Sequence, residues 1–166
     1  GEHTWTYDAS GNLLREEESE YGEISFYREM KYDDKNRMVA LTTFHAADGR
    51  PSHEEMEWEG DEVSHVIKID IYGNKTERFY KYNAQGDAEN IRFSSHEYNS
   101  ETVVEYDAGN NPVHEKETDD KGEVLYEVFR EYNPETKKLM RVETYINRQG
   151  HGTDVHYVLE YEYTFF

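Results

Sequence analysis

Residues 105–110, EYDAGN, place an aromatic residue directly before an aspartate and a glycine-asparagine pair. The same aromatic-then-Asp/Asn turn recurs along the whole 166-residue chain. Its aromatic members, the anchors, follow one another at spacings of 25, 26, 24, 24 and 26 residues: Tyr7, Tyr32, Trp58, Tyr82, Tyr106 and Tyr132. Self-similarity at a fixed spacing indicates a supersecondary unit that stacks on its neighbours, so the sequence predicts about six units.

A second set of turn signals lies between the anchors, for example Tyr72-Gly73-Asn74 and Asp120-Lys121-Gly122. Each unit therefore contains two turns and two runs of about 6 to 9 residues rich in Val, Ile, Tyr, Phe and Thr, which is typical of strands joined by short hairpins. Asp or Asn opens each turn by binding its own backbone, and Gly or Asn supplies a positive φ. We expect an all-β antiparallel meander of about 12 strands, curled into an open or closed barrel-like sheet.

Composition limits the interior of this sheet. Only 35% of the residues are hydrophobic, yet the chain contains 15 Tyr, 7 Phe and 2 Trp. Large half-buried rings suit the surface of a sheet. The sequence predicts a single domain over residues 1–166 with a thin core.

Alternation along the strands that enter the anchors separates two faces. The anchor face carries the anchors together with apolar residues such as Met30, Met56 and Val104, whereas the opposite face mixes charged residues with a few rings. Recurring tyrosines could stack on sugars or pack beside the turns, and the apolar character of their face favours packing. The strands leaving the anchors differ: residues 38–44 and 63–71 are apolar and expected at the centre, whereas 13–18 and 113–118 are charged and expected near an edge.

A formal net charge of −19 argues against nucleic acid or an anionic membrane surface as partner, because both require clustered Lys and Arg. The absence of Cys excludes disulfides, zinc-thiolate sites and thiol nucleophiles. No apolar run has the length of a membrane helix, so no transmembrane segment is expected. The chain begins at Gly1 instead of Met, as after removal of a signal peptide, and we expect a secreted, periplasmic or cell-surface location.

The Tyr-Asp-x-x-Gly pattern, best seen where Tyr7-Asp8 precedes Gly11, resembles the YD repeats of bacterial Rhs-type surface and toxin-shell proteins. More broadly, the chain is similar to small secreted β-repeat domains of Bacteroidetes. The resemblance covers nearly the whole chain. It implies a hairpin-repeat architecture, a secreted or envelope location and no catalytic residues.

A search for chemical motifs finds no phosphate-binding loop, dinucleotide glycine pattern, nucleophile elbow or HExxH, and we expect no cofactor. The best local constellation is His151, Asp154 and His156, because imidazole and carboxylate groups together can hold a divalent transition metal. With 37 acidic residues, composition cannot single out a catalytic carboxylate pair.

We therefore predict a non-catalytic binding or structural module whose ligand is a protein or a saccharide. The alternative is a carbohydrate-binding or glycoside-processing protein that uses acidic and aromatic residues. An enzyme of that kind needs two converging carboxylates in a concave pocket.

Overall fold

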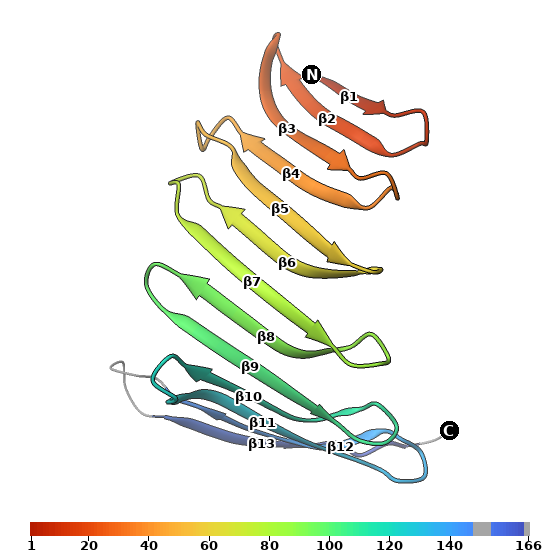
Figure 1. Cartoon of the computed structure of the whole chain (residues 1–166), viewed down its shortest axis with the longest axis vertical. Coiled ribbons are helices and arrows are strands. Elements are labelled where there is room, and N and C mark those ends of the chain that lie inside the picture. Colours follow the sequence, from red (N-terminus) through yellow and green to blue (C-terminus); the bar gives the residue numbers. More distant parts are fainter. Residues whose placement is uncertain (148–153, 165–166) are drawn as a thin grey trace. The chain divides into compact units, whose positions relative to one another are not determined.

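The computed structural model describes residues 1–147 and 154–164, which form β-strands and turns (Figure 1). No helix that could span a membrane occurs in this described part. The strands are β1 (Glu2–Tyr7), β2 (Leu13–Glu20), β3 (Glu23–Tyr32), β4 (Met38–His45), β5 (Ser52–Glu59), β6 (Glu62–Ile69), β7 (Lys75–Tyr82), β8 (Ala88–Ser95), β9 (Asn99–Tyr106), β10 (Pro112–Asp119), β11 (Val124–Tyr132), β12 (Leu139–Ile146) and β13 (Val155–Glu160).

The strands form one 13-stranded sheet whose order follows the sequence from β1 to β13. The strand pairs with a described register, such as β1 with β2 and β9 with β10, are antiparallel. The predicted antiparallel meander is confirmed, and its linear order corresponds to the open form of the sheet. One strand more than the expected twelve is found, because Glu2–Tyr7 forms a strand ahead of the first anchor turn.

Contacts between residues divide the chain into two compact units. The first comprises Gly1–Phe79 and Ser94–Glu97, and the second comprises Tyr80–Phe93 and Tyr98–Phe166, apart from the residues that the structure does not describe.

The anchor turns form because an Asp or Asn side chain satisfies the backbone of its own loop. In the turn after Tyr106, the Asp107 amide donates to the Asn111 carbonyl oxygen at 2.9 Å, and the Asn110 amide donates back to the Asp107 carbonyl at 2.9 Å. The Asp107 Oδ1 atom accepts from the Gly109 and Asn111 amides at 2.8 and 2.9 Å. Asn110 has a φ of 60°, the left-handed conformation that Gly or Asn tolerates best. The predicted turn chemistry is therefore confirmed.

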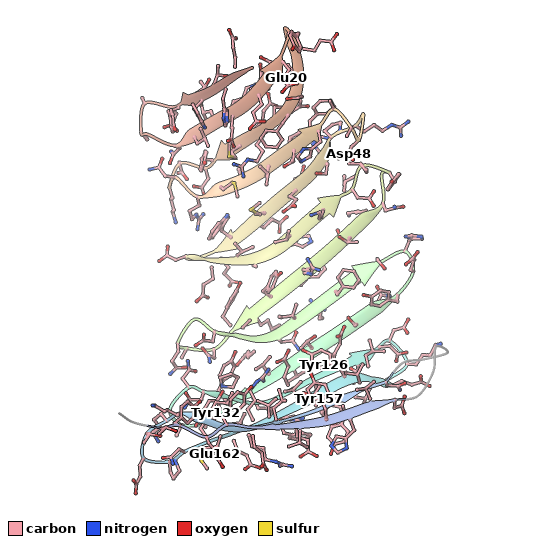
Figure 2. All side chains as sticks on the ribbon, turned by 180° about the vertical axis from the view of Figure 1, so that it is seen from behind. Glu20, Asp48, Tyr126, Tyr132, Tyr157 and Glu162 are labelled. Atoms are coloured by element: carbon pink, nitrogen blue, oxygen red, sulfur yellow. The ribbon has the colours of Figure 1, made fainter. Side chains whose placement is uncertain are left out.

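The two faces of the sheet differ in exposure as the alternation predicts. Along β9, Glu101, Val103 and Glu105 are exposed, whereas Val104 and Tyr106 on the anchor face are half-buried. Val128 on β11, 7% exposed, is the one buried apolar residue in the described part of the chain. Side chains project from every strand (Figure 2), yet the core is as thin as the composition indicates, so stability must come mainly from cross-strand pairs and turns.

The expectation that residues 113–118 lie near an edge is wrong. β10 is an interior strand that pairs with β9 on one side and β11 on the other. Its charges are tolerated there because they have partners: Glu115 accepts hydrogen bonds from the Tyr126 hydroxyl and, at 2.9 Å, from Arg130 Nη2. Charged strands indicate an edge only when their charges are left to solvent.

Candidate binding surfaces

The anchors connect successive hairpins through one recurring hydrogen bond, which we call the anchor hydrogen bond. In each case the ring hydroxyl or indole N–H donates to the carbonyl oxygen of the first residue in an earlier strand. The described cases are Tyr32 to Leu13 (3.1 Å), Trp58 to Met38 (2.8 Å), Tyr106 to Ala88 (2.7 Å) and Tyr132 to Pro112 (3.1 Å). Tyr163, beyond β13, donates to Leu139 in the same way at 2.9 Å. These four anchors are therefore structural, as the sequence predicts, whereas Tyr7 is 57% exposed.

Neighbouring anchor turns also bind each other. In the first unit, Asn12 Nδ2 donates to Asn36 Oδ1 at 2.9 Å, and the Arg37 guanidinium donates to the Gly60 carbonyl. In the second unit, Asn83 Nδ2 donates to Asn110 Oδ1 at 2.8 Å. The polar side chains of these turns thus stabilise the side of the sheet on which the anchor turns lie.

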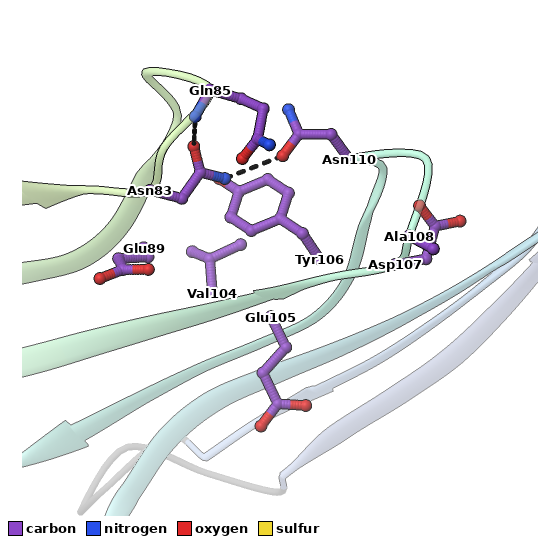
Figure 3. Close-up of a pocket in the computed structure, with 9 residues that line it drawn as sticks. All are labelled: Asn83, Gln85, Glu89, Val104, Glu105, Tyr106, Asp107, Ala108 and Asn110. Atoms are coloured by element: carbon purple, nitrogen blue, oxygen red, sulfur yellow. Dashed lines mark hydrogen bonds between the residues drawn. The ribbon is translucent and has the colours of Figure 1, made fainter.

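A cavity of about 410 Å³ lies beside two anchor turns of the second unit (Figure 3). Nine residues line it: Asn83, Gln85, Glu89, Val104, Glu105, Tyr106, Asp107, Ala108 and Asn110. The Tyr106 ring and the Asn83–Asn110 pair form its polar and aromatic part (Figure 3). Amide groups beside an aromatic ring can bind hydroxyl-rich ligands.

The carboxylates of this cavity do not converge. Glu105 points away from Tyr106 (Figure 3), and its Oε2 atom lies 3.5 Å from His114 Nδ1 on the opposite face. The Asp107 carboxylate is bound within its own turn, and the hydrogen bonds from the backbone and side chain of Asn111 lower its pKa. Burial, together with the negative charges of Asp87 and Glu115, raises the pKa of Tyr106. Glu89 is the third carboxylate that lines the cavity. A single carboxylate cannot supply both the acid and the base that glycoside hydrolysis needs.

A second cavity of about 370 Å³ lies between two loops of the first unit. Ala47, Asp48, Arg50, Ile71 and Tyr72 line it. Tyr72 is 79% exposed, so this ring could contact a ligand without rearrangement of the sheet.

The opposite face carries two similar constellations, the histidine rows. In the first unit, the His65 imidazole stacks on Phe79 at 4.1 Å between ring centroids, and its Nδ1 atom lies 3.3 Å from Glu57 Oε2. Its Nε2 atom is 3.8 Å from Glu77 Oε1, which is too long for a hydrogen bond. The imidazole of His65 therefore lies nearer to Glu57 than to Glu77.

The second histidine row repeats this arrangement in the second unit. His114 stacks on Phe129 at 4.5 Å, and its Nδ1 and Nε2 atoms lie 3.5 and 2.8 Å from Glu105 and Glu127. Sequence reasoning missed both rows, because the members of each row come from three different strands. The spacing from His to Phe, 14 and 15 residues across one hairpin, is the signal that could have found them.

The predicted metal constellation is only partly visible. His151 lies outside the described residues, Asp154 is exposed just before β13, and His156 lies on β13. His156 Nε2 is 2.8 Å from Glu143 Oε1, and its ring stacks on Tyr145 at 4.3 Å. No group of three or more metal-binding side chains occurs among residues 1–147 and 154–164. The site at His151, Asp154 and His156 stays a prediction.

Comparison with known proteins adds no functional information. No protein-family model matches the sequence, and a search of characterised proteins finds no match. Among solved structures, a porin-like protein from Bacteroides uniformis aligns over 96% of this chain and 89% of its own length, with 10% sequence identity and a TM-score of 0.33. A likeness at this level carries no argument about activity or location.

Proposed function

We propose that the chain is a non-catalytic β-repeat module that serves binding or structure in a secreted or envelope protein. The observation that carries the proposal is the recurring anchor hydrogen bond, since the most regular polar and aromatic residues of the chain are used to hold hairpins together. A regular sheet of this kind offers long faces to a protein or saccharide partner.

Kinship with YD repeats is part of the same proposal. The Tyr-Asp-x-x-Gly turn would be kept for its Asx geometry and its anchor hydrogen bond, both of which a hairpin array needs. Exposure of the protein to protease added outside intact cells of its source would support the proposed location. Full protection until lysis would contradict it.

Saccharide binding is the second candidate, and the cavity beside Tyr106 favours it. The Gln85 amide and the Glu89 carboxylate, which line the cavity, provide a donor and acceptors beside an aromatic ring, whereas the Asn83 amide is bound within and between the turns. Recognition of sugar hydroxyls uses these groups.

The experiment that separates the two candidates is a glycan array combined with an assay for reducing-sugar release from every glycan that binds. We expect no sugar release. Binding that is lost in Gln85→Ala, but kept when the exposed Tyr21 is changed to Phe, would establish saccharide recognition at the cavity. Release of sugar that Glu89→Gln abolishes would overturn the non-catalytic proposal.

A further inference from the structure

β13 is the last strand in the order of the sheet, and its residues are more exposed than those of β12, the strand with which it pairs. Tyr157 is 43% exposed, and it stands in register with Thr144 on β12 and, one strand further, with Val128 on β11, which are 5% and 7% exposed. Val158 and Leu159 are 39% and 48% exposed. β13 (Figure 2, at Tyr157) therefore has the residue types of an interior strand with a neighbour on only one side.

The backbone of β13 has hydrogen-bonding groups directed away from β12. The Tyr161 amide donates to the Met140 carbonyl at 2.9 Å, which fixes the side to which this residue directs its backbone groups. Because alternate residues of a strand direct their N–H and C=O groups to the same side, those of His156, Val158 and Glu160 point outward. An added antiparallel strand would pair with these three residues.

The sequence around Val158 is complementary to itself when two copies run antiparallel. If Val158 lies opposite Val158 of a second copy, Tyr157 lies opposite Leu159 and His156 lies opposite Glu160. The Tyr–Leu pairs fall on the anchor face, and the His–Glu pairs fall on the opposite face with Val158. Glu160 has no ion-pair partner among the described residues, and His156 binds Glu143 through Nε2, so Nδ1 is available to a second copy.

We propose that β13 pairs with β13 of a second copy of this chain about a two-fold axis through Val158. The pairing would form about six backbone hydrogen bonds, because each of the three outward residues exchanges two with its partner. A second copy fits better than an unrelated strand, because the edge itself supplies both halves of every cross-strand pair. The proposal goes beyond the module function and does not depend on it.

Cysteine cross-linking tests the pairing directly, because the chain has no Cys of its own. Under mild oxidation, Val158→Cys is expected to give a covalent dimer, since hydrogen-bonded partners in antiparallel strands lie about 5.5 Å apart between Cα atoms. Val155→Cys would lie about 20 Å from its symmetry mate and is expected to stay monomeric. Thr4→Cys on β1, the other end strand, tests the competing edge. A higher yield of covalent dimer from Val155→Cys or Thr4→Cys than from Val158→Cys would overturn the proposal.

Sedimentation equilibrium in 0.15 M salt gives a second, independent test. Val158→Lys places like charges opposite each other on the axis and is expected to raise the dimer Kd by about tenfold or more. Val158→Thr keeps the branched shape without charge and is expected to change the Kd by less than about threefold. A wild-type chain that stays monomeric to millimolar concentration, or equal Kd values for both variants, would refute pairing through β13. The thermal unfolding of each variant confirms that it folds.

Discussion

Removal of one hydroxyl, in Tyr106→Phe, isolates the contribution of an anchor hydrogen bond. The Tyr106 hydroxyl donates to the Ala88 carbonyl at 2.7 Å, the shortest of the described anchor hydrogen bonds. A net contribution of about 0.5–1.5 kcal/mol is typical of an intramolecular hydrogen bond, and the ring packing is unchanged in Phe. We expect the free energy of unfolding to fall by about 1 kcal/mol, which lowers the Tm of a chain of this size by about 2–4 °C.

Urea denaturation followed by circular dichroism measures this change, and Tyr21→Phe is the matched control. Tyr21 is fully exposed, so the same chemical change there is expected to leave the unfolding midpoint where it is. With a slope of about 2 kcal/mol per molar urea, the expected loss in Tyr106→Phe shifts the midpoint by about 0.5 M. A loss below about 0.3 kcal/mol would refute the reasoning and leave ring packing as the sole reason for the anchor spacing.

Three further predictions concern the core, the turns and the metal constellation. Val128→Ala removes two buried methyl groups and is expected to lower the free energy of unfolding by about 1–2 kcal/mol in urea denaturation. Val103→Ala, at a residue 43% exposed, is expected to lower it much less. Equal losses of unfolding free energy in the two variants would contradict a core at Val128. The lowered pKa of Asp107 means that its charge stabilises the folded state above the pKa of the unfolded chain, near 3.8, and that this contribution is lost as the pH falls further. Asp107→Asn keeps the turn, as Asn83 and Asn133 do in theirs, so we expect a smaller loss of unfolding free energy between pH 7 and pH 3 than in the wild type, and an unchanged loss would disprove the assignment. Equilibrium dialysis against zinc and nickel tests the remaining site: a metal held by His151, Asp154 and His156 is lost in His156→Ala, and equal uptake by both proteins eliminates the site.

The repeat and the strand order could be predicted because they depend on local chemistry. An Asp or Asn that caps its own turn, followed by Gly or Asn at a positive φ, needs no knowledge of distant residues, and Asp107 and Asn110 behave as their types require. The exposed and half-buried faces follow from the period of two along each strand.

The acceptors of the anchor hydrogen bonds could not be predicted, because they depend on register between hairpins. Each acceptor lies on the strand before the anchor strand, and the register shifts within two of these pairs: at Glu18/Ser19 between β2 and β3, and at Glu117/Thr118 between β10 and β11. Such bulges change which residues lie opposite each other by one position, and composition does not locate them. The histidine rows could not be predicted for the same reason. The interior position of β10 could not be predicted either, because it depends on partners supplied by β11.

The anchor hydrogen bond has a consequence for the evolution of the chain. Each one joins a ring to a carbonyl only about 18–20 residues earlier in the four internal cases, so every link connects neighbours in sequence. Duplication or loss of one 25-residue unit would therefore create or remove a single link and leave the others intact. Selection could lengthen or shorten such an array one hairpin at a time without redesigning any interior, which a protein built around one central core does not permit.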